Sequence, residues 1–194
     1  KAETAKDGKW IKGPRMKLFK ALKASLGDLP IIAEDLGEFG EDVEKLLADT
    51  AFPGMRIAQI GVSAYDDSTH SPHNYPENCI AYTGTHDNDT LLGCVFAMSH
   101  EDRERALRYC SADGINWEEG GFYSPVCRKI IETVWRSNAR VVILPFQDMC
   151  GFGSDTRMNI PGTAFGNWRY RTTTDTINQV DINYYKTINK IFKR

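Results

Sequence analysis

The sequence predicts an α/β domain in which helices cover a parallel β-sheet. Short runs of apolar residues, each bounded by turn residues, indicate strands that are buried on both faces. Between them lie segments whose apolar residues recur at helical spacing. This alternation is typical of parallel sheets with helical crossovers, and about four strands with flanking helices fit either half of a (β/α)8 barrel or a small doubly wound sheet.

The first quarter of the chain predicts a loop, a helix, a strand and a second helix. Residues 1–14 contain no apolar period and indicate a loop, whereas residues 15–26 have the spacing of a helix that Gly27 ends. The apolar run at residues 30–33 predicts the first buried strand. Residues 41–49 predict the second helix.

The middle of the chain predicts two more strands, with a long loop between them. Residues 54–60 and 79–83 are the strand candidates, and residues 61–78 are rich in Ser, Asp, His, Asn and Pro. Two prolines and an aromatic residue near its end favour an ordered loop. Buried helical character follows at residues 89–98, and Ser99 then predicts the N-cap of a helix that reaches about residue 110.

The last third of the chain predicts a helix, a strand and a closing helix. Pro125 at a first helical position begins a segment with a strong apolar face. Residues 141–144 form the clearest candidate for a buried strand. A polar, Gly-rich stretch runs from there to Arg171, and residues 181–192 indicate the last helix.

The bulk composition excludes several classes of protein. A formal net charge of −2 over 194 residues gives no support for a nucleic-acid partner. The sequence contains no run approaching the roughly 20 apolar residues of a membrane span and opens on no signal-peptide pattern. Its five cysteines are scattered singly, which predicts reduced, buried thiols in a cytoplasmic protein, with no zinc site or disulfide framework.

The most informative stretch is the polar sequence at residues 84–90, directly after the strand predicted at 79–83. It presents His86, Asp87, Asn88 and Asp89 in succession. A surface turn with an Asx cap is one explanation, because Asn and Asp favour turns and N-caps. Polar clusters also follow the other predicted strands, however, and parallel sheets place their active sites at the carboxyl ends of strands. We therefore expect a functional site.

Three loops carry carboxylates that suit acid–base chemistry. They contain Glu34 and Asp35, then Asp87 and Asp89, and finally Asp148. Glycosyl transfer needs such a pair, with one protonated acid and one carboxylate near the anomeric carbon. For Glu34 the simpler alternative is an exposed acid at a helix start. Nearby aromatic residues could stack on sugars, although ordinary packing is the more common role; they are Tyr65, Tyr75, Tyr82, Phe146, Phe152 and Trp168.

Other chemistries find less support in the sequence. His86 beside Asp87 could hold a metal ion, but only His73 offers a further ligand, so we expect no metal. A Ser-His-Asp triad would lack a nucleophile elbow. The Gly-rich stretch at residues 151–154 has neither the lysine nor the spacing of a phosphate-binding loop.

Between about Trp10 and Arg171 the chain resembles the 4-α-glucanotransferases, also called amylomaltases or disproportionating enzymes, of glycoside hydrolase family 77 in the α-amylase-like clan. The similarity rests on several motifs in the family's order. They are Ile32–Gly37, Pro53–Met55, Pro72–Asn78, Tyr82–Thr90, Pro145–Asp148, Arg157–Thr163 and Gly166–Trp168.

The resemblance implies a (β/α)8 barrel and a retaining transfer of α-1,4-glucan segments between maltooligosaccharides, without a cofactor. By motif, Glu34 matches the family's general acid/base and Asp87 its transition-state-stabilising carboxylate. His86 matches the histidine that hydrogen-bonds the sugar in the cleavage subsite. Asn74 matches a loop position that faces donor or acceptor sugars.

One departure from the family pattern is large. The family's nucleophilic Asp lies in an Arg-x-Asp-His motif, and this sequence contains none. We therefore expect residues 1–194 to be a single partial catalytic domain, the C-terminal half of the barrel, which is inactive by itself. Its open sheet edges predict possible self-association. The alternative is a non-catalytic glucan-binding or assembly module.

Overall fold

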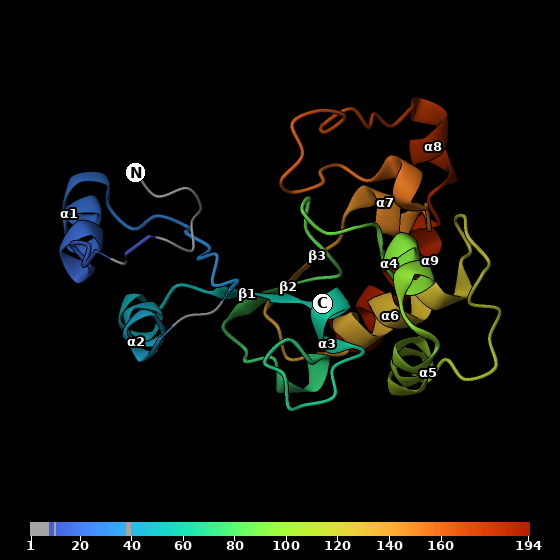
Figure 1. Cartoon of the computed structure of the whole chain (residues 1–194), viewed down its shortest axis with the longest axis horizontal. Coiled ribbons are helices and arrows are strands. Elements are labelled where there is room, and N and C mark those ends of the chain that lie inside the picture. Colours follow the sequence, from blue (N-terminus) through green and yellow to red (C-terminus); the bar gives the residue numbers. More distant parts are fainter. Residues whose placement is uncertain (1–7, 10, 38–39) are drawn as a thin grey trace. The chain divides into compact units, whose positions relative to one another are not determined.

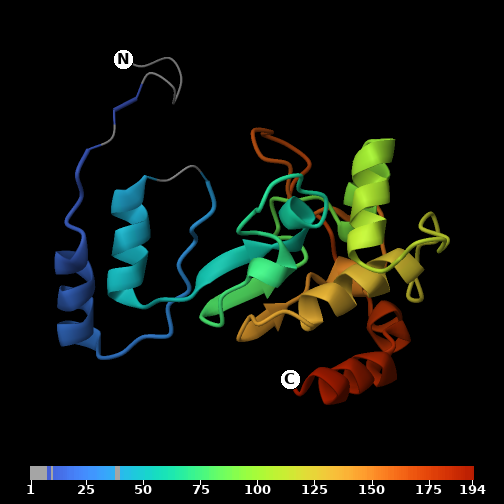
Figure 2. The same ribbon diagram turned by 90° about the horizontal axis from the view of Figure 1, so that it is seen from below.

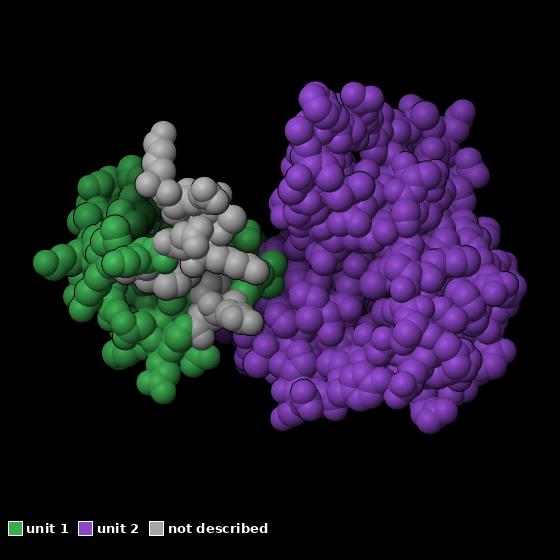
Figure 3. Space-filling model, in the orientation of Figure 1, with its two compact units in different colours: residues 1–54 green, residues 55–194 purple. Residues whose placement is uncertain are grey.

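A computed structural model describes residues 8–9, 11–37 and 40–194 of the chain. Most of the loop predicted at residues 1–14 therefore lies outside the described residues. The chain separates into two compact units, residues 1–54 and residues 55–194, which are coloured separately in Figure 3. Each unit is described by itself below.

Unit 1 contains the two helices that the sequence predicts. Helix α1 spans Met16–Leu26 and helix α2 spans Glu41–Thr50. Gly27 follows α1 with φ +76°, a conformation that glycine adopts without steric cost, and its N–H is donated to Lys23 O. Acidic residues fill the first turn of α2, where they complement the helix dipole.

The strand predicted at residues 30–33 is absent, and this prediction was wrong. The stretch has no regular secondary structure and pairs with no strand among the described residues, and 44% of Ile32 is exposed. Its described backbone hydrogen bonds run from Ile31 N to Leu29 O at 3.0 Å and from Ala33 N to Pro53 O, directly before β1, at 2.9 Å. An apolar run becomes a buried strand only where neighbouring strands satisfy its backbone.

The sheet confirms the predicted α/β fold class. It contains β1 (Gly54–Ile57), β2 (Cys79–Tyr82) and β3 (Val141–Ile143) in that order, and β2 pairs with β3 in parallel, with Ala81 opposite Val142. Strand β1 ends earlier than predicted, because Ala58 begins the short helix α3 (Ala58–Gly61).

Helices α4 (Leu91–Ala97), α5 (His100–Tyr109), α6 (Pro125–Trp135) and α9 (Ile182–Phe192) confirm the predicted helical segments of unit 2 (Figure 1). Side-chain oxygens of Thr90, Ser99, Ser124 and Asp181 cap their N-termini. The structure adds shorter elements that the sequence did not predict. These are α7 (Phe146–Met149), α8 (Thr174–Gln179) and the 3-10 turns Pro72–Asn74 and Ser154–Thr156.

The core of unit 2 lies between the sheet and helices α4, α6 and α9 (Figure 2). Val126, Ile130 and Val134 of α6 are fully buried there. Strand β3 is less buried than its composition predicts, because Val142 packs on the core whereas 40% of Val141 and 41% of Ile143 are exposed. Successive side chains of a strand point to opposite faces, and only one face of β3 is covered.

The cysteines are reduced, as the sequence predicts. Cys79, Cys110, Cys127 and Cys150 are buried and Cys94 is half-buried. Burial raises the pKa of the Cys127 thiol to about 12 and that of Cys110 to about 11. None of the helices in the described part of the chain is both long and apolar enough to cross a membrane.

A buried carboxylate joins three elements of unit 2. Asp148 in α7 is 1% exposed and accepts hydrogen bonds from Thr83 Oγ1, just after β2, and from Leu91 N, at the start of α4, at 2.7 Å. Burial raises the pKa of Asp148 to about 6, although both hydrogen bonds act in the opposite direction. The loop between β2 and α4 is therefore fixed at both ends.

This raised pKa predicts a pH-dependent stability. A carboxyl group that is more basic in the folded state stabilises the fold below its unfolded pKa of about 3.9, and the contribution is lost as the pH rises through about 6. Relative to Asp148→Asn, the wild-type free energy of unfolding should therefore fall by about 2 kcal/mol between pH 4 and pH 7. Urea denaturation followed by tryptophan fluorescence measures this difference.

The matched control for this experiment is Asp113→Asn, which removes an exposed carboxylate from unit 2. A difference between wild type and Asp148→Asn that stays constant from pH 4 to pH 7 would contradict the prediction.

Candidate active site at the carboxyl end of β2

The polar loop after β2 separates into turn-forming and outward-facing residues. Asn88 Oδ1 accepts hydrogen bonds from both N and Oγ1 of Thr85 at 2.9 Å, which closes the turn. Thr90 Oγ1 caps α4 by accepting from Gly93 N at 3.1 Å. The turn explanation thus accounts for Asn88 and Thr90. It leaves His86 and Asp87 unexplained.

His86 and Asp87 form a half-exposed pair. Nε2 of His86 lies 3.3 Å from Oδ1 of Asp87, and 52% of each side chain is exposed. Trp168 stacks at a tilt on His86, with 5.1 Å between ring centroids and 36° between the ring planes. Trp168 is itself 54% exposed and adopts φ +61°, an uncommon conformation for a bulky residue. Its backbone N–H is donated to Met158 O at 2.7 Å.

A second loop, between α7 and α8, contributes further contacts to Asp87. Asn159 Nδ2 donates to Asp87 Oδ1 at 2.6 Å, and Arg157 Nη2 donates to Asp87 O at 2.7 Å. Arg157 also orders its own loop, because its Nε donates to Asn159 O at 2.8 Å. Both the backbone and the carboxylate of Asp87 are therefore positioned by residues about 70 positions later in the chain.

Asp89 ties the same two loops together from the inside. Its carboxylate accepts from Ser154 Oγ at 2.8 Å and lies 3.8 Å from the Arg157 guanidinium. Gly93 permits this close approach, because a Cβ there would come within 2.3 Å of Ser154 Oγ. Asp89 thus supports the loops of the site, whereas the side chain of Asp87 is half-exposed to solvent.

Asn74 lies in the 3-10 turn Pro72–Asn74 of the long loop before β2. Its Nδ2 donates to Ser68 O at 3.1 Å and to the carboxylate of Asp67. The neighbouring His73 anchors the loop to α5, with 2.8 Å between its Nδ1 and Tyr109 Oη. These contacts agree with the predicted ordered loop. Among the described hydrogen bonds of Asn74, none reaches His86 or Asp87.

Glu34 belongs to unit 1, whereas Asn74, His86 and Asp87 belong to unit 2. It is exposed and lies in a segment without regular secondary structure, before α2 begins at Glu41. It is therefore not the helix-start acid that the simpler alternative requires. Its neighbour Asp35 is half-buried and packs against Gly54, where an added Cβ would lie 2.4 Å from its carboxylate. Glu34 is the more accessible of the two acids.

The arrangement in unit 2 can recognise a neutral or cationic ligand that is rich in hydroxyl groups. The Asp87 carboxylate supplies negative charge, His86 supplies a hydrogen-bonding nitrogen, and Trp168 offers an exposed aromatic surface. No group of three or more His, Cys, Asp or Glu residues that could hold a metal ion is found in the described part of the chain.

The sequence indicated some of the supporting residues without their roles. Arg157 and Asn159 lie in a motif that carried the family resemblance, but nothing in the spacing showed that they contact Asp87. Among the aromatic candidates, Trp168 lies at the site, whereas Tyr75 is 2% exposed and belongs to the core. The signal available in the sequence was a loop that follows a strand and contains an arginine, an asparagine and an aromatic residue.

The chain is similar in sequence to known proteins. The family model for 4-alpha-glucanotransferase matches residues 1–176. The 4-alpha-glucanotransferase of Clostridium butyricum is 38% identical over 99% of this chain and 38% of its own length. The chloroplastic/amyloplastic enzyme of Solanum tuberosum is 42% identical over 87% of this chain and 28% of its own length.

Solved structures show the same relationship. The amylomaltase of Streptococcus agalactiae in complex with acarbose superposes with a TM-score of 0.89 at 36% identity, over all of this chain and 38% of that one. The amylomaltase of Corynebacterium glutamicum, at 18% identity and a TM-score of 0.61, shares the fold. The chain thus spans well under half the length of these relatives. By its sequence and its structure, the chain belongs to the 4-alpha-glucanotransferase family.

Proposed function

We propose that residues 1–194 act as one partial catalytic domain, the C-terminal part of the (β/α)8 barrel of a retaining 4-α-glucanotransferase. The enzyme would transfer α-1,4-glucan segments between maltooligosaccharides. The observation that carries the proposal is the outward-facing Asp87, held by Asn159 and flanked by His86 and Trp168 at the carboxyl end of a parallel strand. The Streptococcus agalactiae relative was solved with acarbose, which supports an oligosaccharide ligand.

In the proposed reaction Glu34 protonates the glycosidic oxygen while a carboxylate nucleophile bonds to the anomeric carbon. The leaving sugar departs, and Glu34 then removes the proton from the 4-hydroxyl of an acceptor, whose oxygen displaces the carboxylate. Asp87 stabilises the positive charge that develops on the sugar in both steps, and His86 hydrogen-bonds the sugar beside it. The nucleophile is not among the motifs of this sequence, which contains no Arg-x-Asp-His.

Asn74 would contact sugar in one particular way. Its amide nitrogen is already engaged within its loop by Ser68 O and the Asp67 carboxylate. Its carbonyl oxygen would therefore accept a hydrogen bond from a sugar hydroxyl. The anchors from His73 to Tyr109 fix the loop before the sugar arrives.

Ligand binding tests the role of Asp87. Acarbose carries a basic nitrogen, so Asp87→Asn should weaken its binding roughly tenfold, because the carboxylate no longer attracts the cation. Asn159→Ala should weaken binding by a smaller factor, since it removes the hydrogen bond that orients Asp87. Isothermal titration calorimetry with acarbose measures both effects. Asp155→Asn, an exposed aspartate in the same loop, is the control, and equal affinity of all variants would contradict the role.

The isolated chain should not catalyse the transfer of glucan segments between maltooligosaccharides. A retaining reaction requires a nucleophile about 5–5.5 Å from the acid/base, and this sequence lacks the family's nucleophile motif. Incubation of the purified chain with maltotriose should release no glucose and form no longer oligosaccharides by chromatography. Robust disproportionation would refute this expectation. If the chain binds glucan but never reacts, even when a polypeptide that carries the Arg-x-Asp-His motif is added, the alternative of a binding or assembly module is favoured.

Self-association is the further expectation for the isolated chain. The face of β3 that carries Val141 and Ile143 is about 40% exposed, and apolar sheet faces tend to become covered. We expect light scattering at ~0.1 mM to show dimers or larger species. Val141→Lys should shift the population toward monomer, and a wild-type monomer at that concentration would count against the proposal.

A further inference from the structure

A groove on unit 2 lies apart from the contacts around Asp87. It has a volume of about 520 Å³, within the roughly 300–1,000 Å³ range of ligand sites. One wall is the segment before α6, and the other is the connection from α8 to α9, at the red end of the colour scale in Figure 1. Exposed side chains line it, namely Tyr123, Asn178, Gln179, Ile182 and Asn183.

Tyr123 is the aromatic surface of this groove, and its ring is held in place by Arg128. The centre of the Arg128 guanidinium lies 4.8 Å from the Tyr123 ring centroid and 4.2 Å from that of Tyr184. Tyr123 nevertheless remains 65% exposed. A ring supported by a guanidinium and still open to solvent presents a flat, rigid surface for stacking.

The guanidinium that supports this ring is itself fixed. Arg128 Nη2 donates to Asp181 Oδ2 at 2.7 Å and to Phe122 O at 3.2 Å, and both charged side chains are about three-quarters buried. Asp181 also caps α9 by accepting from Tyr184 N at 3.0 Å. Arg128 and Asp181 thus neutralise one another, so that this ion pair gives the groove no net charge.

The other exposed side chains of the groove are three amides and the aliphatic Ile182, and the less exposed Phe122 and Val180 complete its lining. Asn178, Gln179 and Asn183 each offer donors and acceptors, and Ile182 is 51% exposed. An anion would meet the Asp181 carboxylate beside it, and a cation would meet the Arg128 guanidinium. A neutral ligand with a flat apolar face and many hydroxyl groups fits this chemistry best.

We propose that this groove is a second binding site for an α-1,4-glucan chain, in which a glucose ring stacks on Tyr123 and its hydroxyl groups bond to the amides of Asn178, Gln179 and Asn183. The choice of glucan rests on the proposed function, since the substrate of a glucan transferase is itself a chain of this neutral sugar. The site would hold a long chain while another part of it reacts, which favours long substrates through effective concentration.

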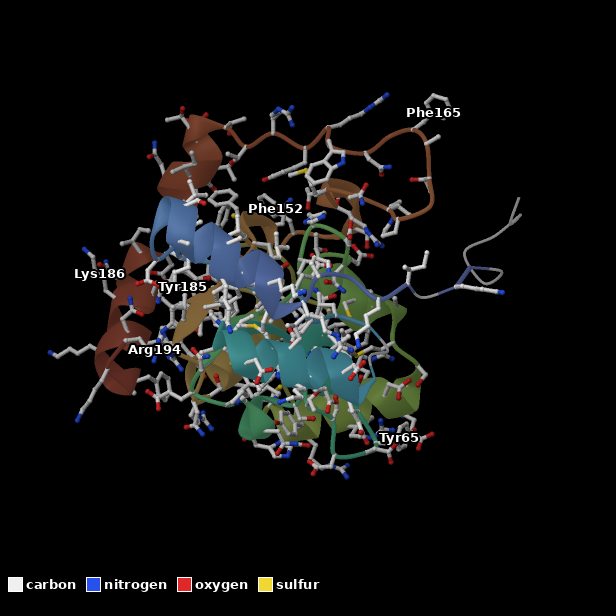
Figure 4. The ribbon with its side chains drawn as sticks, turned by 90° about the vertical axis from the view of Figure 1, so that its left-hand side faces the viewer. Tyr65, Phe152, Phe165, Tyr185, Lys186 and Arg194 are labelled. Carbon is white, nitrogen blue, oxygen red and sulfur yellow. The ribbon has the colours of Figure 1, made fainter. Side chains whose placement is uncertain are left out.

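Affinity electrophoresis of the 194-residue chain in gels with and without amylopectin tests the proposal. Tyr123→Ala should reduce the retardation that amylopectin causes, with a roughly fivefold rise in the dissociation constant, because the stacking surface is lost. Tyr123→Phe should retain most of the binding. Tyr65→Ala is the matched control: Tyr65 is 68% exposed, lies under the Arg105 guanidinium, and sits at the edge of the molecule away from α8 and α9 (Figure 4).

Trp168→Ala separates this site from the one around Asp87. If both sites bind glucan, Trp168→Ala should keep part of the retardation, and Tyr123→Ala in that background should abolish it. Retardation that is unchanged by Tyr123→Ala, or that falls equally with Tyr65→Ala, would overturn the second site. Complete loss of retardation in the single variant Trp168→Ala would also overturn the second site, while leaving the proposed function intact. Circular dichroism confirms the fold of each variant.

Discussion

The contact on which the geometry of unit 2 depends is the buried carboxylate of Asp148. It accepts hydrogen bonds from both ends of the loop between β2 and α4, at Thr83 and at Leu91 N. Burial of this carboxylate is energetically costly, as its raised pKa shows, and the two hydrogen bonds offset part of that cost. A placement of α7 that leaves Thr83 Oγ1 or Leu91 N without this acceptor is disfavoured, because a buried donor would then be unpaired. The loop that carries His86 and Asp87 therefore begins and ends at fixed points.

A second set of contacts joins that loop to the one between α7 and α8. Arg157 reaches both the backbone of Asp87 and the carboxylate of Asp89, and Asn159 orients Asp87 itself. Figure 4 labels Phe165 on the outer part of the same loop, where it is 89% exposed. The inner part of the loop thus supports the site, while its outer part leaves apolar surface available to a ligand.

The local elements could be predicted because their determinants are local. Ser99 caps α5 and Pro125 begins α6 where the sequence placed them, and the apolar period of α6 became its buried face. The strand expected at residues 30–33 failed because an apolar run also needs strand neighbours. The exposure of Val141 and Ile143 likewise depends on which elements cover each face of β3, and the composition of the strand does not determine those elements.

The sequence by itself determined the α/β class, most helix boundaries and the motif that contains His86 and Asp87, because capping, periodicity and residue identity act over a few positions. Only the tertiary structure decided which residues surround Asp87. Asn159 and Trp168 lie more than 70 positions away, and their contacts with Asp87 and His86 arise from the return of the chain after β3. Such long-range pairs depend on the packing of whole elements, so no local pattern encodes them.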